Sequence, residues 1–412
     1  MLKKIPAALV RPGMFIQKFE GPWLAHPFWR RSFLLQEPED VEKILESRVH
    51  ELWIDTEKGI DLIEARSSAS TNEAHMAVTR LPQARMPEPV PTDDGGEPSA
   101  QVDLATEMGR ARKLYDESKS KMRAMFAEAR LGRAIDPEVT RTLVEDIAGS
   151  VQRNPWALIT VARLKNSDEY TYMHSVAVCA LMIALGRQLG LSGEEIRAAG
   201  TAGLLHDLGK ARLPPDVLNK PGKLTEQEFE VIKSHPRHGW DLLRQVRGID
   251  DIALDVCLHH HEKMDGTGYP DGLAGEEISL YARMGAVCDI YDAVTSNRPY
   301  KKGWDPAESL RNMARWTGSH LDARIFAAFV KSVGIYPLGS LVRLESGLMG
   351  VVIEQGESSL LTPRVRTFFC PKSRAYVEPA LVDLARTGCR DRIVGPENPA
   401  QWGIADVEAY WQ

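Results

Sequence analysis

The stretch from His259 to Pro270 constrains the fold most strongly, because it begins with three consecutive histidines. Neighbouring residues on an α-helix point about 100° apart, so three adjacent imidazoles cannot share one helix face. A buried neutral imidazole also needs partners for its ring nitrogens. Ions such as Zn, Fe, Ni and Cu accept neutral imidazole as a ligand. The run by itself is equally compatible with a metal site and with a solvated polar helix end.

The other histidines favour the metal site, since eight of the eleven lie between residues 174 and 320. His174 opens a nearly all-apolar segment typical of a fully buried helix, where a histidine is either a satisfied core residue or a ligand. His206 and Asp207 follow an apolar run, and we expect them near a helix end with Gly209 as its terminator. A buried carboxylate is costly unless it is paired or coordinated.

Two further segments are predicted to bring polar side chains to the same centre. The sequence from Thr225 to Glu228 matches a capping box and predicts the start of a helix that carries His235 and His238. These histidines are one turn apart, and we expect only His235 to face the centre. Asp289 and Asp292 lie three residues apart on one face of an apolar helix. Two buried carboxylates repel each other unless a cation lies near them.

Together these residues resemble a known family. The pattern consists of His174, His206-Asp207 with Gly209-Lys210, His235, His260-His261-Glu262, the segment from Asp265 to Pro270, and Asp289. It resembles the HD-GYP family of bacterial cyclic di-GMP phosphodiesterases, within the HD superfamily of metal-dependent phosphohydrolases. The resemblance covers about residues 168–326, and Gly268-Tyr269-Pro270 separates HD-GYP proteins from the wider superfamily. Residues 1–66 resemble a domain of unknown function often found ahead of HD-GYP domains.

The resemblance implies a role for each motif residue. It makes His174, His206, Asp207 and Asp289 the ligands of one metal, and His235, His260 and His261 those of a second, with Asp207 bridging. It places Lys210 beside the bridging hydroxide and the scissile phosphate, so that Lys210 and Asp207 are the catalytic pair. It assigns substrate binding to Arg298 and Lys301, which would hold the phosphates, and to Asp292, Gly268 and Tyr269.

One position departs from part of the family. Some members place a glutamate four residues before the first histidine and bind a third metal, whereas this chain has Tyr170 there. We therefore expect two divalent ions. The resemblance favours Fe or Mn, although the ligand types alone also admit Zn or Ni. The implied reaction is hydrolysis of cyclic di-GMP to pGpG by a metal-bridging hydroxide, with GMP left open as a further product.

Two other functions stay open at this stage. A catalytically weak module that senses cyclic di-GMP or binds a protein would keep the fold, although the complete ligand set weighs against it. A hydrolase of another cyclic dinucleotide would carry the same HD ligands. The sequence has no G-x-S-x-G elbow, P-loop or G-x-G-x-x-G motif after a strand that would indicate a different chemistry.

The hydrophobic patterning predicts a multidomain, mainly α chain, in which a helical part lies between a small N-terminal α/β domain and a short C-terminal β appendage. The resemblance implies that the helical part is an HD-type bundle. The predicted segments are a regulatory domain at 1–66, a Pro/Ser/Gly linker at 67–103, a helical catalytic domain at 104–335 and a β-rich extension at 336–412. An amphipathic helix from Leu104 either packs within its domain or forms a dimeric coiled coil.

Composition limits the partners and the location. The net charge of −6 argues against a broad basic surface for duplex nucleic acid. Five scattered cysteines without C-x-x-C spacing favour a reducing compartment, and the longest apolar run is far shorter than the ~20 residues that span a bilayer. We expect a cytoplasmic protein without a membrane span. Its expected partners are cyclic di-GMP and either a second copy in a homodimer or a signalling protein.

Overall fold

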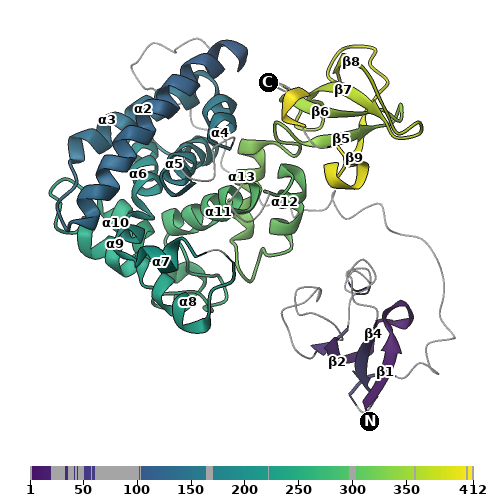
Figure 1. The fold of residues 1–412 in the computed structure, drawn as a ribbon, viewed down its shortest axis with the longest axis horizontal. Helices are drawn as coiled ribbons and strands as arrows, with labels where there is room; N and C mark the ends of the chain where they lie inside the picture. Colours follow the sequence, from purple (N-terminus) through teal and green to yellow (C-terminus); the bar gives the residue numbers. More distant parts are fainter. Residues whose placement is uncertain are drawn as a thin grey trace. The chain divides into compact units, whose positions relative to one another are not determined.

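The computed structural model describes the chain apart from residues 1, 20–32, 36–40, 42–43, 45–50, 57, 61–101, 103, 164–169, 221, 297–302, 357–358, 405–406 and 411–412. The chain forms two compact units, Met1–Pro87 and Glu88–Gln412 (Figure 1). The first unit holds a small sheet, and the second holds the helices together with another sheet. This arrangement is the predicted multidomain, mainly α fold class.

The first unit is built on a four-stranded antiparallel sheet with the order β1-β4-β2-β3. Its strands are β1 (Leu2–Pro6), β2 (Phe15–Phe19), β3 (Phe33–Leu34) and β4 (Glu51–Asp55). Ile16 and Ile54 lie opposite each other in the sheet and are fully buried. Val41 and Ile44 are helical and pack into the same core, so the described part of this unit is α/β, as predicted.

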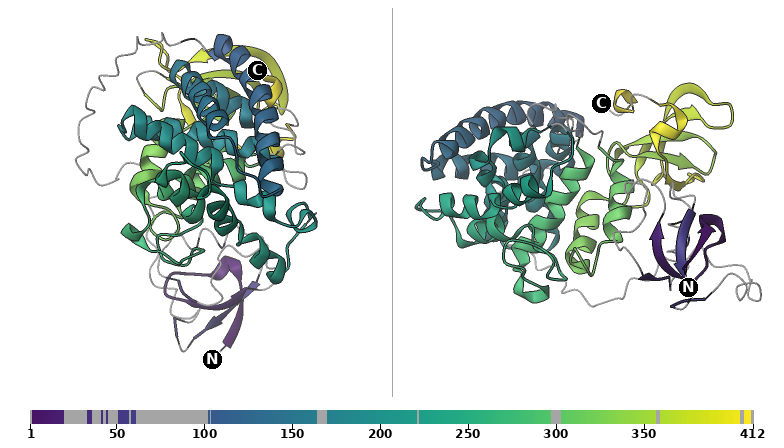
Figure 2. Two further views of the ribbon diagram at one scale, coloured as in Figure 1. Left: turned by 90° about the vertical axis from the view of Figure 1, so that its left-hand side faces the viewer. Right: turned by 60° about the horizontal axis from the view of Figure 1, so that its bottom comes forward.

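The second unit begins with a layered set of helices (Figures 1 and 2). They are α2 (Leu104–Arg130), α3 (Pro137–Arg153), α4 (Pro155–Arg163), α5 (Tyr170–Gln188), α6 (Gly193–Leu205), α7 (Pro215–Leu218), α8 (Glu226–Ile232), α9 (His235–Leu243), α10 (Asp251–His259), α11 (Leu280–Thr295), α12 (Pro306–Ala314) and α13 (Ala323–Val333), with the short 3-10 helix η5 (Leu208–Arg212) after α6. Helix α5 packs against α2, α4, α6, α11 and α13, which explains its unbroken apolar sequence. No helix among the described residues combines the length and the hydropathy needed to cross a bilayer.

Helix α2 belongs to this helical core. Its apolar residues Met122, Phe126 and Ala129 are buried in the same cluster as residues of α5 and α6. Near its start, the buried Glu107 accepts hydrogen bonds from Ser150 at 2.9 Å and from Arg153 at 2.8 Å. The apolar face of α2 is therefore buried inside the unit, which favours packing within the domain over the coiled-coil alternative.

Two sequence-based expectations about helix ends were wrong. The capping box at Thr225 starts α8, but that helix ends at Ile232, and His235 and His238 lie on the separate helix α9. Pro236 has no N–H to donate to the Ile232 carbonyl, so the α8 hydrogen-bond ladder cannot continue.

Gly209 does not end α6, which stops at Leu205, because Gly209 lies within η5. A Cβ atom at Gly209 would be 1.9 Å from the His235 carbonyl oxygen. The absence of a side chain at this position is what lets η5 lie directly against α9.

The C-terminal part of the second unit is a five-stranded antiparallel sheet with the order β8-β7-β6-β5-β9. Its strands are β5 (Leu341–Leu344), β6 (Met349–Glu354), β7 (Arg364–Cys370), β8 (Ala375–Asp383) and β9 (Ile393–Pro396). Leu104 and Trp156 of the helical part pack against the core of this sheet, which includes Leu338 and Val342. The predicted C-terminal β appendage is therefore present and shares a core with the helices.

Candidate metal centre

His174 lies near the start of α5, and its ring is fully enclosed by protein. Its Nε2 atom is 2.9 Å from Asp289 Oδ1, and its Nδ1 atom is 2.6 Å from Asp292 Oδ2. Both carboxylates come from α11, where a spacing of three residues places them on one face. Burial alone would lower the pKa of His174, but the hydrogen bonds to Asp289 and Asp292 outweigh burial and raise this pKa. His174 thus lies between two carboxylates that would otherwise repel each other.

His206 and Asp207 directly follow the last turn of α6. His206 Nδ1 donates to the Gly203 carbonyl at 2.8 Å, so the Nε2 atom of the neutral ring is free to act as a ligand. That Nε2 atom is 3.3 Å from Asp207 Oδ2, which is also 3.5 Å from His174 Nε2. The other oxygen of Asp207, Oδ1, is 3.2 Å from His235 Nε2. Asp207 therefore lies between two sets of imidazoles.

His235 and His260 are oriented in the same way as His206. His235 Nδ1 donates at 2.7 Å to the Ile232 carbonyl, the group that Pro236 leaves without a backbone donor. His260 Nδ1 donates to the Val256 carbonyl at 3.0 Å. The Nε2 atoms of the two rings face each other at 3.4 Å. An imidazole whose Nδ1–H is given to a carbonyl presents an Nε2 lone pair, as metal-binding histidines commonly do.

Two buried atoms at the centre have no hydrogen-bond partner among the described residues: His206 Nε2 and Asp207 Oδ1. Leaving buried polar atoms unpaired is destabilising. Around them, the described residues form two sets whose ligand atoms lie within 4.8 Å of one another. The first ligand group is His174, His206 and Asp207, and the second ligand group is Asp207, His235, His260 and His261. Cations beside Asp207 would satisfy both orphan atoms, so this donor set fits a metal centre.

The protonation states of the second ligand group also suit a cation. Burial, together with the charge on neighbouring rings such as His261, holds the pKa of His260 well below its usual range. Burial likewise lowers the pKa of His235 and lowers that of His261 to about 3. Burial would raise the pKa of Asp207, but the Lys210 ammonium and the imidazoles around Asp207 outweigh burial and hold this pKa well below the usual range. Neutral imidazole and ionised carboxylate are the forms that bind metals.

Asp289 lies close to both ligand groups. Its Oδ1 atom is 2.9 Å from His174 Nε2 and 3.9 Å from His206 Nε2, while its Oδ2 atom is 3.9 Å from His261 Nδ1. The sequence associated Asp289 with the first ligand group alone. In the structure its two oxygens point to opposite groups, so Asp289 contributes a second negative charge to the whole centre.

Lys210 extends from η5, and its Nζ atom contacts Asp207 Oδ2 at 2.5 Å. Its side chain is 20% exposed, in contrast to the 1% of Asp207, so the ammonium group lies at the border between the buried cluster and solvent. A fixed positive charge in this position can stabilise a negatively charged phosphate that approaches the centre.

Gly268 and Tyr269 lie in a loop that returns to the second ligand group. The Tyr269 ring stacks on the His261 ring with a centroid distance of 4.8 Å and an interplanar angle of 28°. A Cβ atom at Gly268 would be 2.5 Å from the Cα atom of Glu262 and from the backbone nitrogen of Lys263. Glycine at this position therefore permits a close approach of two backbones, and Tyr269 covers one face of a candidate ligand.

Glu262, which the sequence analysis named in the family pattern without assigning it a role, supports the same loop. Its carboxylate is buried, and Oε1 accepts the backbone N–H groups of Asp271 at 2.7 Å and of Gly272 at 3.0 Å. The sequence signal was its position directly after His261. Only the folded chain shows which donors this carboxylate binds.

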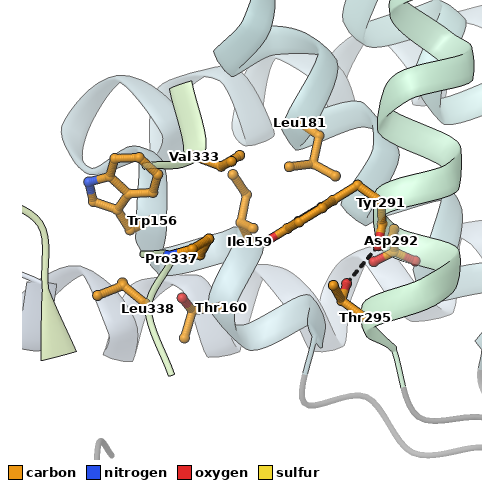
Figure 3. Close-up of a pocket in the computed structure, with 10 residues that line it drawn as sticks. All are labelled: Trp156, Ile159, Thr160, Leu181, Tyr291, Asp292, Thr295, Val333, Pro337 and Leu338. Atoms are coloured by element: carbon orange, nitrogen blue, oxygen red, sulfur yellow. Dashed lines mark hydrogen bonds between the residues drawn. The ribbon is translucent and has the colours of Figure 1, made fainter. Parts of the chain in front are cut away.

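Asp292, for which the sequence predicts a substrate contact, contacts a ligand histidine in the structure. Its side chain is buried, Oδ2 contacts His174 Nδ1, and Oδ1 accepts a hydrogen bond from the Ser296 hydroxyl at 3.1 Å. The residue borders a cavity of about 20 Å³, enough for about one water molecule, that is also lined by Trp156 and Tyr291 (Figure 3). This geometry suits a carboxylate that orients a ligand histidine, while the substrate contact expected of Asp292 stays a prediction.

The remaining expected site residues are distributed as follows. Arg298 and Lys301 lie outside the described residues, so their phosphate contacts stay predictions. His238 joins neither ligand group. His259, which the sequence left unassigned, contacts Asp255 and Asp271 instead of the cluster.

Comparison with known proteins adds to this geometry. The HD domain family matches residues 152–325, a range that contains every residue of both ligand groups. A Pseudomonas aeruginosa protein named cyclic di-GMP phosphodiesterase is 52% identical over 412 residues, which cover 100% of this chain and 96% of that protein. The chain belongs to the HD-GYP family. A domain of unknown function, DUF3391, matches residues 2–140, in agreement with the resemblance noted for the N-terminal segment.

Other relatives share the HD-GYP part over less of their length. A Xanthomonas campestris response regulator named cyclic di-GMP phosphodiesterase is 44% identical over 180 residues, or 42% of this chain and 47% of that protein. A Vibrio cholerae protein named 3'3'-cGAMP-specific phosphodiesterase 1 is 35% identical over 166 residues, or 40% of this chain and 38% of that protein. The named substrates thus differ among HD-GYP relatives.

Proposed function

We propose that this HD-GYP protein is a metal-dependent phosphodiesterase that hydrolyses cyclic di-GMP to pGpG, with GMP as a further product to be tested. The observation that carries the proposal is Asp207, whose two buried oxygens face two sets of imidazoles. The Pseudomonas relative, matched over the whole chain and named for this activity, supports the choice of substrate.

The metal ligands we propose are those of the two ligand groups together with Asp289. When bound, two divalent ions would lower the pKa of a shared water and neutralise the phosphodiester oxygens. The protein holds the rings in place, because three of the histidines donate Nδ1–H to backbone carbonyls and His174 is held by Asp292. Such a site requires little rearrangement when charge develops in the transition state.

Lys210 and the segment after α11 supply the proposed substrate contacts. Lys210, which contacts Asp207, would place its ammonium group beside a phosphate oxygen of the bound substrate. Arg298 and Lys301 follow the end of α11 at Thr295, and we propose that they bind the nucleotide phosphates. Tyr269 would shape the pocket beside His261.

We propose two ions per chain, with Fe or Mn as the first candidates. Tyr170 is the first residue of α5, one turn before His174, where a third ion would call for a carboxylate. Elemental analysis of protein purified with each metal checks the number. Three tightly bound ions per chain would contradict it.

The domain roles are also proposals. No described residue within 1–66 belongs to either ligand group, so we propose that this segment regulates the helical part at 104–335 or recruits a signalling partner. The alternative to a signalling partner is a homodimer. Measuring the molar mass of the protein in solution, with and without cyclic di-GMP, would identify a homodimer.

A second candidate substrate is a mixed cyclic dinucleotide such as 3'3'-cGAMP, for which one Vibrio relative is named. Protein loaded with Mn or Fe should be incubated with cyclic di-GMP, 3'3'-cGAMP and a generic phosphodiester. Faster turnover of cyclic di-GMP supports the proposal. Faster turnover of 3'3'-cGAMP would show that the mixed dinucleotide is the preferred substrate. Tight binding of cyclic di-GMP without turnover by metal-loaded protein would instead identify a sensor module.

A further inference from the structure

His259 is the member of the histidine run that neither ligand group uses. It is the last residue of α10, and its Nδ1 atom is 2.7 Å from Asp255 Oδ1, one turn earlier on the same helix. Its Nε2 atom is 3.2 Å from Asp271 Oδ2, which lies just beyond Pro270. One imidazole therefore joins the end of a helix to the Tyr269 loop, defined here as residues 264–274.

Both carboxylates that contact His259 have further partners. Asp271 Oδ1 accepts from Arg237 Nη2 of α9 at 2.8 Å. Asp255 Oδ2 accepts from the Ser279 hydroxyl, which in turn accepts the Ala282 N–H at 3.0 Å and caps α11. The network thus contacts three helices close to the metal centre. Helix α9 carries His235, α10 directly precedes His260 and His261, and α11 carries Asp289.

We propose that His259 is a positioning residue that fastens the Tyr269 loop to the ligand-bearing helices and thereby strengthens substrate binding. This inference rests on the proposed function. Asp271 is two residues from Tyr269, whose ring stacks on His261. Movement of Asp271 should therefore shift the Tyr269 ring beside the second ligand group, where we propose that the substrate binds. The loop has further attachments, among them the Asp271 and Gly272 N–H groups to Glu262 and the Tyr269 N–H to the His261 carbonyl at 3.3 Å, and release of His259 should therefore loosen the loop without unfolding it.

His259 is the less exposed of the two partners of Asp271, which is itself 39% exposed. The His259 side chain is 15% exposed, whereas that of Arg237 is 44% exposed. Exposed ion pairs contribute little, so most of the fastening should come from His259. The competing explanation is a helix-end cation that complements the helix dipole and affects only the stability of α10.

The test uses the full-length, metal-loaded protein with His259→Ala, Asp271→Ala, the double variant and His259→Gln. The matched control is Asp241→Ala, which removes an exposed carboxylate of α9 that pairs with Arg244. Steady-state kinetics, metal content, thermal melting and hydrogen exchange of residues 264–274 are measured for each. Glutamine can donate to one carboxylate and should recover part of the effect.

We expect His259→Ala and Asp271→Ala each to raise KM about three- to tenfold, with a smaller change in kcat and unchanged metal content. The double variant should be affected less than the sum of the two single variants, because both remove the His259–Asp271 contact, although each also removes a further contact, with Asp255 or with Arg237. Exchange in residues 264–274 should quicken in both, while Asp241→Ala matches the parent protein.

Additive effects in the double variant, or a melting shift with unchanged KM and loop exchange, would overturn the inference. Loss of metal in His259→Ala would also overturn it, since His259 would then support the ligands themselves. If the parent protein does not hydrolyse cyclic di-GMP, the proposed function fails, whereas the exchange experiment still decides whether His259 fastens the loop.

Discussion

The two ligand groups share Asp207 but are supported in different ways. In the first ligand group, His174 comes from the middle of the helical core and is oriented by a carboxylate, Asp292. In the second ligand group, His235 begins a helix and His260 caps one, and both are oriented by backbone carbonyls of the preceding turn. The first ligand group therefore depends in part on long-range packing between α5 and α11, although its His206 is oriented by the Gly203 carbonyl, and the second depends on local chain geometry at helix ends.

This difference indicates which substitutions should weaken each ligand group. A carboxylate from another helix can be removed by one substitution, whereas a backbone carbonyl cannot. The first ligand group should therefore respond to changes in residues that touch no ion. The second should respond mainly to changes in the ligands or in the loop that covers them.

The largest expected effect comes from removing the shared residue. Asp207→Ala should eliminate both ions and reduce turnover by roughly a thousandfold or more, because both ligand groups lose their common carboxylate. Elemental analysis and initial rates measure this. Two full equivalents of metal in the variant would show that the two groups are independent of Asp207.

A selective effect is expected from Asp292→Asn, which keeps the size of the side chain but removes its charge. Affinity for one of the two ions should fall by roughly ten- to a hundredfold, because the partner of His174 Nδ1 is weakened. Metal titration followed by elemental analysis resolves the two ions. An increase in KM with both ions retained would instead support the substrate-binding role that the sequence predicts for Asp292.

Arg298→Ala should leave both ligand groups intact and act on the substrate. Loss of one charge-assisted phosphate contact should raise KM and lower kcat/KM by roughly ten- to a hundredfold, with unchanged metal content. Kinetics paired with metal analysis provide the check. Normal kinetics with a slightly lower melting temperature would indicate a cation that only complements the end of α11.

The smallest effect should follow from removing the N-terminal unit. A truncated chain that begins near Leu104 should keep both ions and its basal turnover, because neither ligand group includes a residue from the first unit. Metal content and rates of the truncated and full-length proteins are compared at equal concentration. If the folded, truncated protein loses metal, the N-terminal unit supports the centre directly.

The sequence by itself determined the helical core, both small sheets and the identity of the histidines and aspartates that meet at the centre. Hydrophobic patterning is a local property, and it correctly indicated the buried helix α5 that carries His174. The resemblance grouped Asp207 with His174 and with His235, and these residues lie together in the structure. These residues could be named in advance because the resemblance rests on many positions at once.

Only the tertiary structure decided which atoms face which partners. A hydrogen bond such as His174 to Asp292 joins residues 118 positions apart, and no local pattern reports its direction. The same holds for the break between α8 and α9, where Pro236 frees a carbonyl that then orients His235. It also holds for His259, whose ring is turned from its two neighbours by 100° steps along the helix and so binds Asp271 instead of the cluster. Side-chain direction and burial depend on how distant elements pack, and that information appears only when the chain is folded.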